Sequence, residues 1–228
     1  MKLKEYRKKR HFDVSPEPEG QGGASNKNSA RLIYVVQKHR ASQLHYDFRL
    51  ECNGTLSSWA IPKGPSLDPS VKRLAMQVED HPIEYAKFEG VIPKGEYGGG
   101  TVMIWDRGTW KPDEEDVDAS LGRGELKFSL FGEKLRGSWV LVRTRGYGSR
   151  SDRSWLLIKH RDAYASREDI TIKAPRSVVS SRLLQEIARD EGGDAEQAAT
   201  GDPVRQATLR APKKKTSPAF GRARSRKA

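Results

Sequence analysis

Four ionisable residues lie at alternate positions of one short segment, a spacing typical of a strand with one chemically active face. If residues 45–51 form a strand, successive side chains point to opposite sides. The ionisable side then consists of His45, Asp47, Arg49 and Glu51. The other side suits a hydrophobic core and consists of Tyr46, Phe48 and Leu50. The pattern predicts a strand that is packed on one face and available for binding or catalysis on the other.

His39 can add a third metal ligand to this face. It lies six residues before His45, so a short hairpin can bring it beside His45 and Asp47. Two imidazoles and one carboxylate suit Mn²⁺, Fe²⁺, Co²⁺ or Zn²⁺, with coordination positions left open. Arg49 lies about 7 Å beyond Asp47 on the same face, where it can bind an oxyanion next to the metal. The alternative is a surface ladder in which these side chains only pair with one another.

Further candidates follow two later strands. In the predicted strand 73–79, Leu74, Met76 and Val78 form an apolar face, opposite Arg73, Gln77 and Glu79. His81 and Tyr85 come directly after it, where Pro82 turns the chain. Lys63 and Lys94 share one context, since each follows Ile-Pro and precedes Gly. Either lysine can meet a phosphate or simply be solvated.

The elements that position these residues are mostly strands. Runs rich in Val, Ile, Tyr, Phe and Trp predict strands at 32–37, 45–51, 55–61, 73–79, 101–106, 125–130, 137–144 and 154–160. Eight short strands indicate an antiparallel barrel or sandwich. One helix is expected at 178–190, with Ser177 as its N-cap. Four of the five tryptophans fall in strands and suit the core, whereas Trp110 is expected to be exposed.

Charge is concentrated at the two ends of the chain. The 228 residues carry a net charge of +12, to which residues 1–10 contribute +5 and residues 201–228 contribute +8, leaving −1 for the rest. Such basic arms attract nucleic acid through counterion release, unless they are only solvated tails. Cys52 is the single cysteine, so an intramolecular disulfide is excluded. Without an apolar run of membrane-spanning length or a secretory signal, we expect a cytoplasmic protein that does not bind membranes.

Three blocks of the sequence resemble a known family. They read HxxxxxHxDFRLE from His39, WAxPKGPS from Trp59 and VEDHPxxYxxFEGxIPxGxYGxGT from Val78. Together they resemble the 3′-phosphoesterase domain of bacterial DNA ligase D, which also occurs as a free-standing protein, over roughly residues 5–160. The resemblance implies a compact eight-stranded β-barrel. It also implies removal of a 3′-terminal phosphate, and in many members trimming of a terminal ribonucleotide, during non-homologous end joining with a divalent metal, typically Mn²⁺ (Co²⁺ and Zn²⁺ being alternatives).

The resemblance further implies roles for individual residues. The implied metal ligands are His39, His45 and Asp47, in agreement with the triad inferred from alternation. The implied phosphate contacts are Arg49, His81 and Tyr85. The implied supporting residues are Arg10, Glu17, Gln37, Lys63 and Arg73. His11 stands where the family has an Asp that is linked to ribonucleotide trimming, so we expect robust phosphate removal and weak trimming.

These observations predict a mainly β chain in four parts: an irregular lead-in (1–30), the barrel (31–175), a short helix (176–190) and a disordered basic tail (191–228). The tail begins where a fused ligase module would follow, which favours either the free-standing form or a piece excised from a fusion.

The function they favour is a metal-dependent 3′-end-processing phosphoesterase that acts on DNA primer-template ends and works with an end-joining ligase. Arg49 would neutralise phosphoryl charge, Tyr85 would orient a phosphate oxygen, and His81 would be the general acid, because imidazole titrates near neutral pH. Two alternatives stay open. One is a non-catalytic barrel that binds DNA ends and recruits a ligase, and the other is an Fe²⁺ oxygenase built on the same triad.

Overall fold

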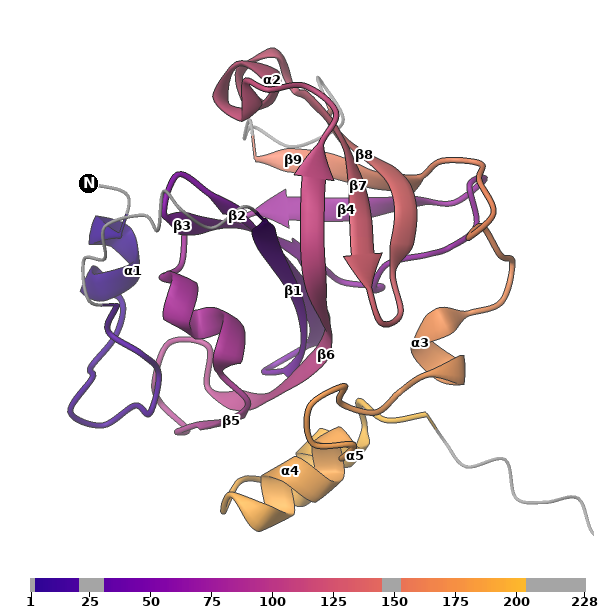
Figure 1. Cartoon of the computed structure of the whole chain (residues 1–228). Coiled ribbons are helices and arrows are strands. Elements are labelled where there is room, and N and C mark those ends of the chain that lie inside the picture. The colour runs from indigo at the N-terminus through magenta and orange to yellow at the C-terminus, as the bar shows by residue number, and fades with distance from the viewer. Residues whose placement is uncertain (1–2, 21–30, 145–152, 204–228) are drawn as a thin grey trace, which may run out of the picture.

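A closed antiparallel β-barrel forms the centre of the computed structural model, which describes residues 3–20, 31–144 and 153–203 (Figure 1). Around the ring, the strands are β1 (Leu32–Arg40), β2 (Leu44–Cys52), β3 (Thr55–Ile61), β4 (Lys72–Gln77), β9 (Ser154–Lys159), β8 (Arg136–Arg143), β7 (Glu125–Gly132) and β6 (Gly100–Pro112). The ring closes because β6 also pairs with β1, and the short β5 (Gly90–Ile92) pairs with β6 outside it. The predicted eight-stranded antiparallel barrel is confirmed.

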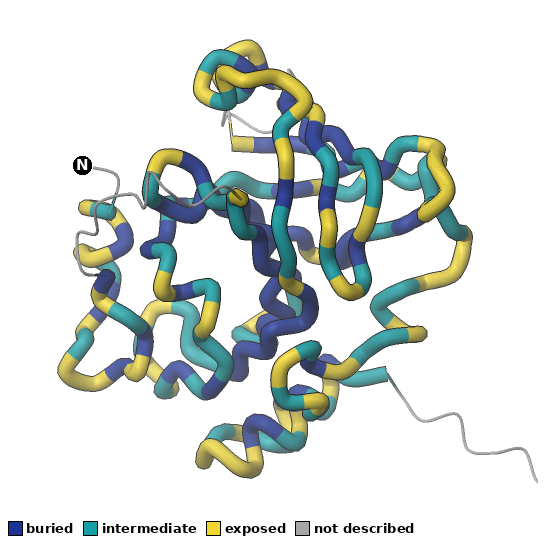
Figure 2. The backbone as a smooth tube through the Cα atoms, viewed as in Figure 1, coloured by how far each residue is buried: buried dark blue, intermediate teal, exposed yellow. Residues whose placement is uncertain are grey.

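Large apolar side chains fill the barrel. Figure 2 shows buried residues following the central strands, and the core cluster includes Trp59, Trp105, Trp139 and Trp155, as expected. Trp110 was expected to be exposed, and this is wrong, since only 3 % of it is accessible. The reason is that β6 continues through Trp110 to Pro112, so the indole packs edge-on against Phe128 instead of lying in a loop.

The two faces of β4 are the reverse of those predicted. Ala75 is fully buried in the core, whereas Leu74 is 46 % exposed. The side-chain oxygen of Gln77 accepts a hydrogen bond from the indole N–H of Trp155, which is a core residue. Arg73 therefore shares the inward side of the strand with Ala75 and Gln77. Alternation separates two faces, but it does not say which of them lies inside a barrel.

The described residues also form six short helical segments outside the strands of the barrel. They are α1 (Lys4–Lys8), η1 (Ile83–Lys87), α2 (Val117–Arg123), α3 (Ile170–Lys173), α4 (Leu184–Asp190) and α5 (Ala195–Ala199). The helix expected from residue 178 begins at Leu184, because the Ser177 hydroxyl binds the amides of Val179 and Ser180 in a turn. Disorder from residue 191 is also wrong as far as residue 203, where α5 packs on α4. None of these helices has the length and apolar character needed to span a membrane.

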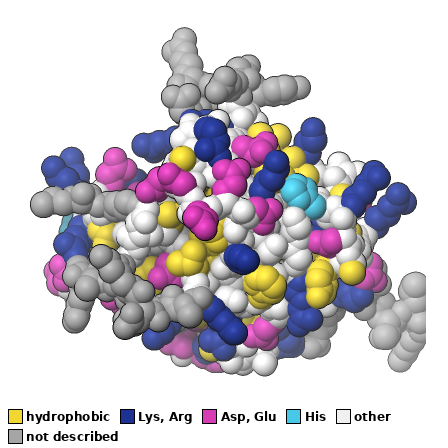
Figure 3. Space-filling view, turned by 45° about the horizontal axis from the view of Figure 1, so that its top comes forward, with side chains coloured by type: hydrophobic (Ala, Val, Ile, Leu, Met, Phe, Trp, Pro, Cys, Tyr) yellow, Lys and Arg dark blue, Asp and Glu magenta, His cyan; other side chains and the backbone are white. Residues whose placement is uncertain are grey.

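Charged side chains on the body are mixed in sign. On the face in Figure 3, Lys and Arg side chains alternate with Asp and Glu without forming one large patch of a single sign. This agrees with the almost neutral total for residues 11–200. The basic tail beyond residue 203 lies outside the described residues, as do residues 21–30 and 145–152.

The C-terminal hairpin of α4 and α5 closes one end of the barrel. Leu184, Ile187 and Ala198 belong to the same core cluster as the strands. The ammonium of Lys38, which is 1 % exposed, lies 3.4 Å from a carboxylate oxygen of Asp202. That carboxylate also accepts hydrogen bonds from the first amides of α4. Burial lowers the pKa of Lys38, although Asp202 opposes this effect. The buried ammonium is therefore stabilised by the carboxylate that follows the hairpin.

We expect Asp202→Asn to lower the free energy of unfolding by about 3–5 kcal/mol, because it leaves the Lys38 ammonium buried without a carboxylate. Urea denaturation followed by circular dichroism measures this change. Adding Lys38→Met to Asp202→Asn is expected to recover part of the loss, since no charge is then stranded in the core. Equal stability of the wild type and Asp202→Asn would contradict this account.

Candidate active site

The candidate site lies on the outer face of the barrel, across the β1–β2 hairpin. The antiparallel register places His39 opposite His45 and Gln37 opposite Asp47. Because residues in register share a face, the four side chains emerge together on the side away from the core. Phe48 and Tyr46 lie on the opposite face, inside the barrel. The hairpin that was predicted to bring His39 back beside His45 and Asp47 is therefore present.

The two histidines and Asp47 can hold a metal ion. Their ligand atoms all lie within 4.8 Å of one another, and Nδ1 of His39 and Nε2 of His45 are each 3.6 Å from the same oxygen of Asp47. Ligands with bonds of ~2.0–2.2 Å to one ion lie about 3–3.5 Å apart, so small rotations suffice.

The second nitrogen of each ring is bound to a backbone carbonyl. Nε2 of His39 lies 2.8 Å from the oxygen of Gly98, and Nδ1 of His45 lies 3.1 Å from the oxygen of Gln43. A ring that donates its N–H to a carbonyl presents a lone pair from the other nitrogen, as metal-binding histidines do. Both lone pairs then face Asp47, so the residues present fit a divalent cation.

Asp47 remains an anion although it is buried. Burial alone would raise its pKa, but the positive charge of Arg49, and next the neighbouring imidazoles of His39 and His45, hold the pKa well below its usual value. Arg49 lies 3.3 Å from the same carboxylate oxygen that faces both imidazoles. One carboxylate thus links the candidate metal ligands to a fixed cation.

Arg49 is held rigidly by its neighbours. Its Nε donates to the side-chain oxygen of Gln37 at 2.8 Å, and its guanidinium lies 4.9 Å from the ring centre of Tyr85. The amide of Gln37, which is fully buried, is itself bound to the carbonyls of Tyr85 and Phe88. Gln37 therefore positions Arg49, and this is the role of a supporting residue that the sequence implied for it.

His81 lies between two guanidinium groups. Its Nε2 is 3.2 Å from Arg10 and its Nδ1 is 3.0 Å from Arg49. Burial and these two positive charges lower the pKa of His81 well below its ordinary value. The ring is therefore neutral at pH 7. The titration near neutral pH that was expected of His81 is not what its surroundings in this structure produce.

The N-terminal segment, for which the sequence predicted only an irregular lead-in (1–30), covers this side of the pocket. Tyr6 is fully buried in a second apolar cluster with Leu56 and Tyr85. Arg10 donates to Glu17 at 2.8 Å, and the hydroxyl of Tyr85 donates to the same Glu17 oxygen at 2.9 Å. Sequence patterns missed this because the segment contributes single aromatic and charged anchors rather than a periodic face.

A cavity of about 270 Å³ contains the assembled groups. Its lining includes Arg10, His39, His45, Asp47, Arg49, Glu79, His81, Tyr85, Tyr97 and Gly98. Sequence analysis did not nominate Glu79, which pairs with Arg10, or Tyr97. Both residues lie in the block from Val78 that carries the family resemblance, and Glu79 was otherwise predicted only as part of the polar face of strand 73–79.

Four implied residues do not line this cavity: Glu17 and Gln37 are bound to lining residues, whereas Lys63 and Arg73 lie elsewhere. Lys63 is exposed and lines a different pocket, beside Lys38 and Thr171 at the end closed by the C-terminal hairpin. Arg73 lies on the inward side of β4, and its buried Nε has no hydrogen-bond partner among the described residues.

His11 lies at the rim, with its side chain 75 % exposed and Nδ1 3.0 Å from a carboxylate oxygen of Glu96. It therefore joins the N-terminal segment to the loop that contains Tyr97.

The comparisons with known proteins agree with this geometry. The model of the DNA Ligase D 3′-phosphoesterase domain matches residues 37–143, which include the triad, Arg49, His81 and Tyr85. Residues 37–143 belong to the DNA ligase D 3′-phosphoesterase domain family. The match to this family ends before β9, which lies between β4 and β8 in the ring.

Curated relatives of this family match a larger part of the chain. The multifunctional non-homologous end joining protein LigD of Pseudomonas aeruginosa is 54 % identical over 186 residues, which is 80 % of this chain and 22 % of the relative. The LigD protein of Mycobacterium tuberculosis is 46 % identical over 145 residues, or 64 % of this chain and 19 % of the relative. The LigD protein of Mycolicibacterium smegmatis is 38 % identical, with shares of 74 % and 22 %. The chain therefore spans about a fifth of the length of these relatives.

We expect His45→Ala to weaken Mn²⁺ binding at least about 100-fold, more than the ~10–100-fold typical of losing an outer-shell partner. Isothermal titration calorimetry measures the affinity, and circular dichroism shows whether the fold persists. His160→Ala is the matched control, because His160 is bound to Ser138 and lines no part of the cavity. Wild-type affinity in His45→Ala would remove His45 from the candidate metal site.

Proposed function

We propose that this chain is a metal-dependent phosphoesterase that processes the 3′ ends of DNA during non-homologous end joining. The observation that supports this most strongly is the sharing of Asp47. Its carboxylate lies 3.6 Å from both candidate metal-binding imidazoles and 3.3 Å from Arg49. A phosphate oxygen bound to the metal would therefore lie within reach of a guanidinium. The membership of residues 37–143 in the phosphoesterase family supports the same reaction class.

Each residue of the pocket has a distinct part in this proposal. A divalent ion held by His39, His45 and Asp47, which we take to be Mn²⁺, supplies Lewis-acid polarisation of the phosphate and activation of water. Arg49, held by Gln37, neutralises charge that develops on the phosphoryl oxygens. Burial, and next the charge of Glu17, raise the pKa of Tyr85 well above its usual value, so its hydroxyl stays protonated and can donate to a phosphate oxygen.

His81 can serve as general acid only if substrate binding raises the pKa of its imidazole enough for the ring to take up a proton. Its pKa is lowered by burial and by Arg49 and Arg10. A phosphate dianion beside these groups would offset their positive charge and raise the pKa of the imidazole. In this proposal the imidazole takes up a proton from solvent when the phosphate binds, and then passes it to the leaving 3′ oxygen.

The cationic surroundings favour phosphate chemistry over the alternatives. Arg10 and Arg49 are 8 % and 3 % exposed, and both guanidinium groups lie at the cavity that contains the triad. An Fe²⁺ oxygenase would give these buried cations no function. A non-catalytic end-binding barrel would need neither the converging ligand atoms nor the rigid support of Arg49. The partners we propose are primer-template 3′ ends and an end-joining ligase, as the names of the relatives suggest.

The direct test is release of phosphate from a primer-template with a 3′-phosphate, with and without Mn²⁺. We expect turnover only with the metal, its loss in Asp47→Ala, and a fall in kcat/KM of roughly 10- to 150-fold in Arg49→Ala, the range for losing one charge-assisted contact. The control is Arg107→Ala, because Arg107 is an exposed arginine with a distant partner, Glu133 at 3.9 Å. Tight binding of the end without turnover would replace this proposal by the recruitment function.

For ribonucleotide trimming, we expect the wild type to be much slower than for phosphate removal, because the imidazole of His11 cannot replace a fixed anion. The contact with Glu96 changes the design of the test. His11→Asp alone would place two carboxylates about 3 Å apart and repel the loop. The informative comparison is therefore His11→Asp with Glu96→Gln, measured against Glu96→Gln alone on primers ending in a 3′-ribonucleotide. Equal trimming by these two variants would show that residue 11 does not set this activity.

A further inference from the structure

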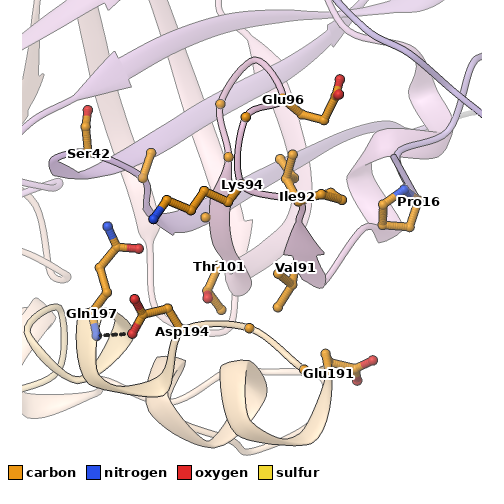
Figure 4. A pocket seen from close by; sticks show the side chains of 18 residues that line it. Pro16, Ser42, Val91, Ile92, Lys94, Glu96, Thr101, Glu191, Asp194 and Gln197 are labelled. Carbon is orange, nitrogen blue, oxygen red and sulfur yellow. Dashed lines mark hydrogen bonds between the residues drawn. The ribbon is translucent and has the colours of Figure 1, made fainter. Parts of the chain in front are cut away.

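A second, larger hollow adjoins the cavity of the triad. We call it the upstream groove; it has a volume of about 980 Å³ and lies between the loop 93–100 and the turn 191–194 that joins α4 to α5 (Figure 4). Ala41, Ile92 and Gly98 line both the groove and the triad cavity. The two spaces are therefore continuous, and the groove leads away from the candidate metal ligands along the outside of the barrel.

One charged side chain in the groove is unpaired. Lys94 is exposed, points into the groove in Figure 4, and has no hydrogen-bond or ion-pair partner among the described residues. The three carboxylates of the lining are already engaged. Glu96 lies 3.0 Å from His11, Glu191 lies 3.2 Å from Arg182, and Asp194 accepts the amide hydrogen of Gln197 at 2.8 Å. The free ammonium is thus the group that remains to bind an external anion.

The wall beside Lys94 is bare backbone. Gly98, Gly99 and Gly100 follow one another along it. A Cβ at Gly99 would lie 2.8 Å from the carbonyl oxygen of Pro93, and Gly98 has a φ of +78°. The loop therefore requires glycines for its own folding, and their lack of side chains lets a ligand backbone approach closely. The opposite wall belongs to the C-terminal hairpin.

We propose that the upstream groove holds the nucleotides that precede the 3′ end of the processed strand, with a backbone phosphate bound by Lys94. This inference rests on the proposed function, because it takes the 3′ end to lie at the triad. On one side of the triad cavity, Arg10 and Glu79 pair and bring the N-terminal segment over the pocket. Gly98 lines both spaces, and its carbonyl oxygen lies 2.8 Å from Nε2 of the candidate ligand His39, so the groove offers a strand whose end reaches Asp47 a route out of the cavity.

Two substrates that differ only in upstream nucleotides test the proposal on the full chain. Thymidine 3′-monophosphate has no upstream phosphate, whereas a single-stranded thymidine hexamer with a 3′-phosphate has several. We expect Lys94→Ala to leave kcat/KM for the mononucleotide unchanged and to lower it about tenfold for the hexamer, as for the loss of one charge-assisted contact. Lys111→Ala is the matched control, since Lys111 is also exposed and lies at the far end of the strand that begins at Gly100.

Binding without turnover provides an independent measurement. Fluorescence anisotropy with a labelled hexamer ending in a 3′-hydroxyl reports the groove even if the protein hydrolyses nothing. We expect Lys94→Ala to weaken this binding about tenfold and to reduce the slope of log affinity against log salt by about 0.7, the value for one phosphate contact on a single strand. If this result appears without any phosphate release, the proposed function fails while the groove assignment stands.

Three results would overturn the inference. The first is an equal loss in Lys94→Ala and Lys111→Ala, which would indicate general surface charge. The second is an equal loss on the mononucleotide and the hexamer, which would place Lys94 at the reacting phosphate. The third is a loss that appears only after a template strand is annealed, which would assign the groove to the template.

Discussion

The structure of the candidate site depends on keeping one buried carboxylate ionised. Asp47 faces two imidazoles and a guanidinium through a single oxygen, and these contacts outweigh the cost of its burial. The rigidity of the surroundings follows from this requirement. Arg49 must stay close to Asp47. The fully buried Gln37 holds Arg49 there, because its side-chain oxygen accepts a hydrogen bond from Arg49 and its amide donates to the carbonyl of Tyr85. Burial, together with the positive charges of Arg49 and Arg10, then keeps His81 neutral.

Apolar runs predicted an antiparallel barrel or sandwich, strand alternation and a hairpin predicted that His39, His45 and Asp47 lie together, and the family resemblance indicated the barrel. The spacing of His39, His45 and Asp47 required only a hairpin and two strands, and the register of β1 and β2 provides both. The inward side of β4 could not be derived in this way, because Leu74 and Ala75 fit either face of a strand whose outer surface is partly covered. The roles of Tyr6, Arg10 and Glu17 were equally beyond periodicity. These roles depend on contacts with residues of η1 and of the site that are distant in sequence. Only the family resemblance indicated Arg10 and Glu17.

Because the site is on the outside of the barrel, its chemistry and the hydrophobic core use different residues of the same strands. Phe48 packs inward while its neighbours Asp47 and Arg49 face the cavity. Substitutions at the site therefore leave the core packing intact, whereas the walls contributed by the N-terminal segment and the loop 93–100 can vary without changing the barrel. Specificity for the end of a strand would arise from these walls rather than from the ring of strands.

The buried contact between Lys38 and Asp202 also has a consequence for the order of events during translation. The two residues are separated by 164 positions in the chain. The ribosome therefore releases Lys38 long before its counter-ion, and at about 5–20 residues per second the delay amounts to roughly 8–30 seconds. During this interval the ammonium of Lys38 lacks its carboxylate partner. Lys38 can therefore be buried with its counter-ion only after the turn that contains Asp202 has been synthesised.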